Sequence, residues 1–221
     1  MNNILFAKTH FKSIDKNLAT EEIMKVDKKY WFWDPYRKTS MLSLMTKGAK
    51  TGPTGTALNL NGEWEWLPYT PDIIREWFED EIFPWMGGKT RIMALKTLPN
   101  AKNDEHIDCD PEQVGTLQHK FRVVLLGRTG TLYYKTKSGN VHVPDIEEPF
   151  IMDGSWPHGM INDSDDIKLT IAAGAPWFGN KSYDNIDTLM KCSDYDMPDD
   201  LNPFFVSPEL KRLMNLFKIT G

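Results

Sequence analysis

The feature that most constrains the fold begins at Arg91, where short apolar runs alternate with Gly, Pro, Asn and Asp. These runs have the length of strands and are too short for typical helices: RIMALKTL, FRVVLLG, TLYYKTK, NVHVP, PFIMDG and IKLTIAAG. Lys137-Ser138-Gly139-Asn140, between two of them, is typical of a hairpin turn. The series predicts antiparallel strands in a sandwich or a small barrel.

Two helices are predicted before this series. Apolar residues recur at roughly helical spacing over 13–30. A second helix opens with Thr70 as its cap and Pro71 at its first position, and Pro84 together with the Gly87-Gly88 pair is expected to end it. The Gly- and Thr-rich segment 46–62 predicts a loop.

The length of 221 residues suits a single large domain. We expect it to have an N-terminal extension of helices and loops (1–90), a barrel core (91–177) and a C-terminal loop followed by a helix (178–221). The last helix is expected to begin at Ser207-Pro208.

Charge and cysteine content limit the class of protein. The net charge of −5, without a run of Lys or Arg, argues against a nucleic-acid partner bound through its phosphates. Cys109 and Cys192 are too few for a disulfide framework, and the sequence has neither a signal-peptide pattern nor an apolar run of membrane-spanning length. We therefore expect a cytoplasmic protein without a membrane segment; the oligomeric state is left open.

His106-Ile107-Asp108 is the most informative tripeptide. In an extended segment, residues i and i+2 point to the same face, so this imidazole and this carboxylate can converge on one metal ion. The tripeptide follows the loop-like stretch 99–103, and we expect it where a strand begins.

A second histidine would complete a set of two imidazoles and one carboxylate. The candidates are His119, His142 and His158. His158 is favoured because it follows the strand-like PFIMDG and precedes another strand, whereas His142 alternates within a strand and His119 has no partner pattern. Such a triad leaves coordination positions open and suits non-haem Fe(II) that must bind a co-substrate and O₂.

Two basic residues lie in apolar runs. Lys168 follows His158 by ten residues and begins an apolar strand. It either meets a bound dicarboxylate or extends to water at the strand edge, and the residues favour neither interpretation. Arg122 either holds a carboxylate bidentately or forms a structural salt bridge, with the salt bridge slightly favoured.

Together these residues resemble the Fe(II)/2-oxoglutarate-dependent dioxygenase superfamily. The resemblance rests on His106-x-Asp108, the distal His158, and Lys168 ten residues later, within the run FIMDGSWPHGMINDSDDIKLTI. Within the superfamily, residues 91–177 are most similar to the aspartyl/asparaginyl β-hydroxylase-like group. There are two departures: Lys168 stands where the group more often has arginine, and Val124 where it often has histidine.

The resemblance implies a mainly β fold with flanking helices, a double-stranded β-helix of the jelly-roll or cupin type. It implies that His106, Asp108 and His158 bind Fe(II), that Lys168 binds 2-oxoglutarate, and that Arg122 binds the co-substrate or shapes its pocket. No catalytic residue beyond the metal ligands is expected. With O₂, such an oxidoreductase hydroxylates an unactivated C–H bond and releases succinate and CO₂.

The substrate is expected to be a small molecule, an amino acid or a peptide side chain. Trp156, Trp64 and Trp66 are candidates for contacting it, and core packing is the alternative for each. The alternative function is that of a cupin-like metal-dependent lyase or isomerase, or of a ligand-binding barrel without catalysis.

Overall fold

The strands predicted from Arg91 onward are present. The computed structural model describes residues 4–47, 63–108, 119–174 and 185–196. Within these ranges the apolar runs form β5 (Arg91–Thr97), β7 (His119–Leu126), β8 (Leu132–Thr136), β9 (Gly139–His142), β10 (Phe150–Asp153) and β12 (Lys168–Gly174). Two strands that the pattern does not predict complete the series, β6 (Ala101–His106) and β11 (His158–Asn162).

These strands pair in jelly-roll order. The larger sheet contains β10-β7-β12-β5 as neighbours, and the smaller sheet has the order β6-β11-β8-β9. All of these pairs are antiparallel, and the chain passes repeatedly from one sheet to the other. This is the topology of a double-stranded β-helix, so the expected fold class is confirmed.

Further strands extend the larger sheet at both edges. β1 pairs with β10 and with β13, while β3 pairs with β5, β2 and β4. Their bounds are β1 (Ile4–Thr9), β2 (Trp31–Asp34), β3 (Thr39–Lys47), β4 (Trp64–Trp66) and β13 (Ile186–Lys191). Helices cover one face of this sheet, so several of these strands are buried on both faces. Such strands lack the alternation of apolar and polar residues from which a strand is predicted.

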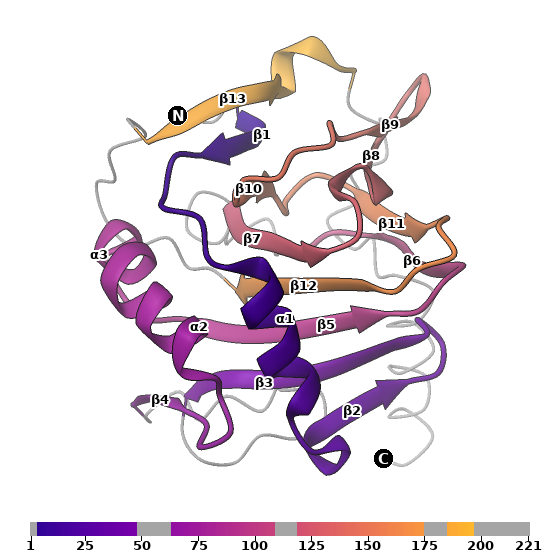
Figure 1. The fold of residues 1–221 in the computed structure, drawn as a ribbon. Coiled ribbons are helices and arrows are strands. Elements are labelled where there is room, and N and C mark those ends of the chain that lie inside the picture. The colour runs from indigo at the N-terminus through magenta and orange to yellow at the C-terminus, as the bar shows by residue number, and fades with distance from the viewer. Residues whose placement is uncertain (1–3, 48–62, 109–118, 175–184, 197–221) are drawn as a thin grey trace, which may run out of the picture.

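The helices pack on the larger sheet (Figure 1). Helix α1 (Lys16–Lys25) lies inside the predicted range of 13–30, and its cap is Asp15, whose side chain accepts from the Leu18 N–H at 3.0 Å. Three short 3-10 turns accompany the strands: Lys28–Tyr30, Thr129–Thr131 and Cys192–Asp194.

The second predicted helix is present but differs at both ends. It runs through α2 (Asp72–Trp77), a π-helical turn (Phe78–Ile82) and α3 (Phe83–Met86). Thr70 does not cap it, because its hydroxyl donates to the Leu44 carbonyl at 2.7 Å, and Pro71 takes the cap position. At the other end Pro84 lies inside the last turn and does not end the helix, whereas Gly87, the first residue of the predicted Gly87-Gly88 pair, does end it with a left-handed φ of 72°.

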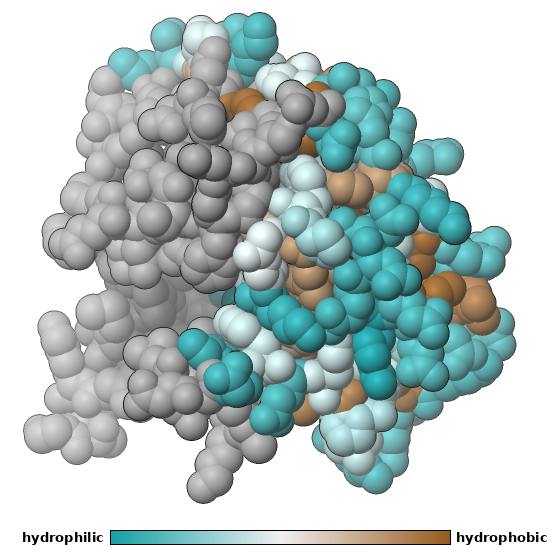
Figure 2. Space-filling model, turned by 90° about the vertical axis from the view of Figure 1, so that its left-hand side faces the viewer, coloured by the Kyte–Doolittle hydropathy of each residue, from teal (hydrophilic) through white to brown (hydrophobic). Residues whose placement is uncertain are grey.

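Apolar side chains form two separate clusters. One lies between the larger sheet and the helices and includes Phe78, Phe121 and Val123. The other includes Val124 and Tyr134 and joins the larger sheet to the smaller one. Val123 and Val124 belong to opposite clusters because successive residues of a strand point to opposite faces. On the face drawn in Figure 2 the described surface is largely hydrophilic, with scattered hydrophobic side chains.

Some predicted features lie outside the described residues, namely most of the 46–62 loop and the helix expected at Ser207-Pro208. In the described ranges, every helix is too short or too polar to cross a bilayer.

Candidate metal centre and pocket

Two neighbouring strands of the smaller sheet bring His106, Asp108 and His158 together. His106 is the last residue of β6, His158 is the first of β11, and the two are direct partners in the antiparallel pairing. Asp108 Oδ1 lies 3.4 Å from His106 Nε2, and Asp108 Oδ2 lies 3.2 Å from His158 Nε2. One ligand atom from each of the three residues lies within 4.8 Å of the others. The tripeptide stands at the end of a strand and not at the beginning, as was expected, because β6 occupies the stretch read as a loop.

Hydrogen bonds determine which nitrogen of each imidazole faces Asp108. His106 Nδ1 lies 2.8 Å from the Asp104 carbonyl, and His158 Nδ1 lies 2.8 Å from the Trp156 carbonyl. A carbonyl only accepts, so each Nδ1 carries a proton and each ring turns its Nε2 toward Asp108. Burial, and then the nearby His106, lower the pKa of His158, which keeps this ring neutral.

Two of the converging atoms lack hydrogen-bond partners. His158 Nε2 and Asp108 Oδ2 are both buried, and neither takes part in a hydrogen bond. A buried polar atom without a partner costs free energy, and a cation between these atoms would remove that cost. Two imidazole nitrogens and one carboxylate, each imidazole fixed through its other nitrogen, are a ligand set that suits Fe(II).

Cations surround Asp108. Lys120 Nζ lies 3.1 Å from Oδ2, and Arg122 Nη2 lies 3.5 Å from the same oxygen. Burial by itself raises the pKa of Asp108, but the Lys120 ammonium beside it acts in the opposite direction, and this pKa is held well below its ordinary value. Asp108 is therefore ionised, the state that binds a metal.

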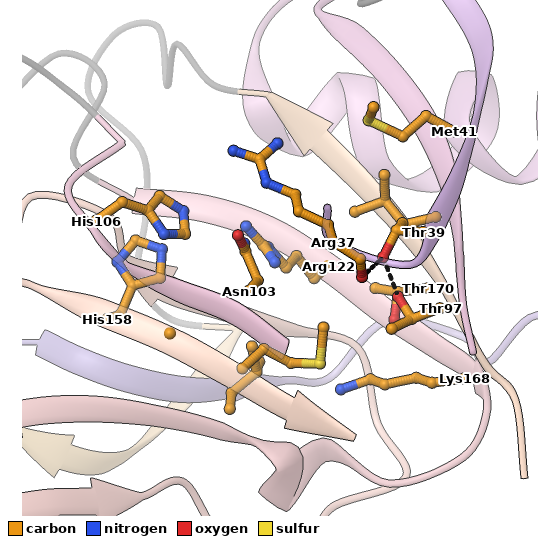
Figure 3. Close-up of a pocket in the computed structure, with 14 residues that line it drawn as sticks. Arg37, Thr39, Met41, Thr97, Asn103, His106, Arg122, His158, Lys168 and Thr170 are labelled. Carbon is orange, nitrogen blue, oxygen red and sulfur yellow. Dashed lines mark hydrogen bonds between the residues drawn. The ribbon is translucent and has the colours of Figure 1, made fainter. Parts of the chain in front are cut away.

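A pocket extends from the two histidines to Lys168, with Arg122 also on its wall (Figure 3). Its volume is about 650 Å³ when the open mouth is included. Thirteen of its lining residues besides Arg122 come from β2–β3, β5, β6, β8, β11 and β12: Arg37, Thr39, Met41, Leu95, Thr97, Asn103, His106, Leu132, His158, Gly159, Met160, Lys168 and Thr170.

Lys168 is the buried cation of this pocket. Its side chain is only 4% exposed, and its Nζ donates to the Thr131 hydroxyl. Burial, and then the charge of Arg122, lower the pKa of Lys168 to about 7. In the described ranges no carboxylate lies within ion-pair distance of it. An anion bound in the pocket would give Lys168 the counter-ion that no carboxylate of the described residues supplies at ion-pair distance.

The other candidate residues lie elsewhere. Trp156 is 1% exposed, packs in the inter-sheet cluster and donates through Nε1 to the Lys135 carbonyl, while its own carbonyl orients His158. Trp66 packs on Phe78 and donates to Glu79 at 2.7 Å, and Trp64 packs beside it on β4. These three tryptophans are not among the residues that line the pocket.

The other two candidate histidines contact backbone carbonyls. His119 Nε2 contacts the Ile4 carbonyl at 2.8 Å, and His142, on β9, contacts the Gly130 carbonyl at 2.7 Å. Neither belongs to the ligand set.

The sequence interpretation missed Lys120, Asn103 and Arg37. Lys120 could have been predicted from the sequence, because it precedes Arg122 by two residues and therefore lies on the same face of β7. Asn103 lies on β6, a strand that was read as a loop. Arg37 lies in the turn between β2 and β3, and local pattern does not predict that this turn reaches the pocket (Figure 3).

Comparison with known proteins finds likeness only at the level of structure. No protein-family model matches the chain, and no curated protein matches it. HygX from Streptomyces hygroscopicus, solved with nickel and 2-oxoglutarate bound, is 10% identical with a TM-score of 0.49, over 87% of this chain and 94% of that one. A 2OG-Fe(II) oxygenase family oxidoreductase from Burkholderia pseudomallei is 8% identical with a TM-score of 0.48, over 76% and 82%. A Pseudomonas putida prolyl-4-hydroxylase is 13% identical with a TM-score of 0.46, over 80% and 94%.

Proposed function

We propose that this protein is an Fe(II)- and 2-oxoglutarate-dependent oxygenase that hydroxylates an unactivated C–H bond of an amino acid, a peptide side chain or a small metabolite. One observation carries the proposal. The two histidines of the ligand set line the same pocket as a buried lysine that has no carboxylate partner among the described residues. This pairing suits a co-substrate that has a metal-chelating group at one end and a carboxylate at the other. The aspartyl/asparaginyl β-hydroxylase-like group, which the sequence resembles most, is the subgroup we propose.

Each residue has a role in this scheme. His106, Asp108 and His158 would hold the metal, which when bound supplies the O₂ chemistry that couples 2-oxoglutarate decarboxylation to hydroxylation. Lys168 would bind the distal carboxylate of 2-oxoglutarate. Arg122, between Asp108 and Lys168, would contribute a second positive charge to the same anion. Because Asp108 occupies a ligand position that a halide would need, hydroxylation is favoured over halogenation.

The protein's own groups also prepare the site for this chemistry. The Asp104 and Trp156 carbonyls keep both Nδ1 protons in place, so that both Nε2 atoms stay free for the metal. Burial of His158 and Lys168 limits the water around the site.

The test is succinate release. The protein is reconstituted with Fe(II) without oxygen, 2-oxoglutarate and O₂ are added, and succinate is measured by mass spectrometry with and without a panel of amino acids and metabolites. His158→Ala should abolish succinate. His10→Ala should not, because His10 is a half-exposed residue that pairs with Asp187 outside the pocket.

Equal succinate from the wild type and His158→Ala would contradict the proposal. Metal binding without any succinate would instead favour a cupin-like lyase or isomerase, or a ligand-binding barrel.

A further inference from the structure

Lys120 is a buried cation that neither the ligand set nor the co-substrate site uses. It lies on β7 two residues before Arg122, so both side chains point to the same face of that strand. Its side chain is 15% exposed, and its Nζ lies 3.1 Å from Asp108 Oδ2. The carboxylate proposed as a metal ligand therefore already has an ammonium against one of its two oxygens.

The pair is tightly enclosed. A Cβ added at Gly154 would lie 3.0 Å from Asp108 Cβ and 3.4 Å from Lys120 Cε. The Gly154 carbonyl also accepts the backbone N–H of Asp108 at 2.7 Å. Lys120 is thus held against Asp108 by its surroundings, unlike a flexible surface lysine.

The oxygen next to Lys120 is also the oxygen nearest His158. Asp108 Oδ2 lies 3.2 Å from His158 Nε2, and it is buried without accepting a hydrogen bond. The lysine contact is accordingly an ion pair to the same oxygen that faces His158. A divalent cation held by this oxygen and the histidines would come close to the ammonium and be repelled by it.

Lys120 therefore acts in opposite directions on the two forms of the protein. Without metal, its charge stabilises a buried carboxylate that would otherwise lack a close ammonium partner. With metal, the same charge lies beside a cation that already neutralises Asp108, so the lysine opposes binding.

We propose that Lys120 is a positioning residue that competes with the metal for Asp108: it holds this carboxylate between the two histidines before metal binds, and it lowers the metal affinity of the site. The inference rests on the metal site proposed above. It adds that a residue outside the ligand set determines how readily the metal exchanges.

The test uses Mn(II), a redox-stable probe, and two readouts other than activity. The Kd for Mn(II) is measured by competition with a fluorescent chelator, and Tm is measured with chelator and with saturating Mn(II). Lys120→Met should bind Mn(II) about tenfold more tightly or better, because one repelling charge is removed at short range. Its metal-free Tm should fall by several °C, and the rise in Tm on adding Mn(II) should be larger than in the wild type.

Two further variants serve as controls. Lys120→Arg keeps the charge and should keep a Kd near that of the wild type. Lys8→Met removes a partly exposed lysine on β1 that pairs with Glu148 and does not line the pocket, and it should leave the Mn(II) affinity unchanged. If Lys120→Met does not fold, Lys120→Gln replaces it, and this neutral variant should bind Mn(II) more tightly than Lys120→Arg.

The outcomes separate this inference from the proposed function. A neutral variant that binds Mn(II) no more tightly than the wild type, or that lowers Tm equally with and without metal, overturns the role given to Lys120 and leaves the metal site standing. A wild-type protein that binds no Mn(II) overturns the metal site itself.

Discussion

Lys168 offers a sharp test of the pocket because its charge has no carboxylate partner within ion-pair distance in the described ranges. Lys168→Met keeps the length of the side chain and removes the charge. A charge-assisted hydrogen bond to a buried anion contributes about 1.5–3 kcal/mol, which corresponds to a factor of about 10 to 150 in Kd. We expect 2-oxoglutarate to bind Lys168→Met more weakly by a factor in this range, with little change in metal affinity.

The pH dependence of 2-oxoglutarate binding is a second, independent test of the role of Lys168. Burial and Arg122 lower the pKa of Lys168 to about 7 in the ligand-free protein, and a bound carboxylate would raise this pKa. The contribution of the lysine to binding is therefore complete below pH 7 and is lost as the pH rises above it. The wild-type Kd for 2-oxoglutarate should be nearly constant below about pH 7 and should rise by up to about tenfold per pH unit above it. Lys168→Met should lack this dependence.

The assay is calorimetric titration of 2-oxoglutarate into Mn(II)-loaded protein without oxygen, from pH 6 to 8.5. Lys96→Met is the matched control, because Lys96 lies one residue from Thr97 on β5 but stacks over Trp31 outside the pocket. A wild-type Kd that is the same at pH 6.5 and 8.5, together with an unchanged Kd in Lys168→Met, would refute the role of Lys168. The anion would then have to bind elsewhere in the pocket.

Three other substitutions are expected to change the Tm of thermal unfolding. At pH 6, ligand-free Lys168→Met should have a higher Tm than the wild type, because the buried charge is gone. At pH 8.5, where wild-type Lys168 is largely neutral, the difference in Tm between the variant and the wild type should be smaller. Gly159→Ala should lower both Tm and Mn(II) affinity, since the new Cβ would lie 2.5 Å from the Tyr133 hydroxyl, beside a metal ligand; an unchanged Mn(II) Kd would contradict this. Tyr134→Phe should lower Tm by several °C, because the Tyr134 hydroxyl donates to the buried Leu5 carbonyl at 2.7 Å and that carbonyl would lose its partner.

A strand could be predicted from the sequence only where its side chains pack against an apolar core. β7 and β12 carry long apolar runs, and both were predicted. β6 was read as a loop because it is an edge strand of the smaller sheet and carries polar residues such as Asn103 and His106 toward the pocket. A strand that lines a polar pocket does not show the apolar alternation on which the prediction depends.

Local features could be derived from the amino-acid sequence: the turn-bounded strands, the spacing of His106 and Asp108, and the position of Lys168 at the start of a strand. These follow from short-range periodicity, which residues a few positions apart encode directly. Long-range contacts determine that His106 and His158 are partners across two strands, that both of their Nε2 atoms face Asp108, and that Lys120 contacts Asp108. They also place Trp156 in the core. These outcomes depend on strand register and on burial between sheets, which are set by contacts between residues far apart in the chain.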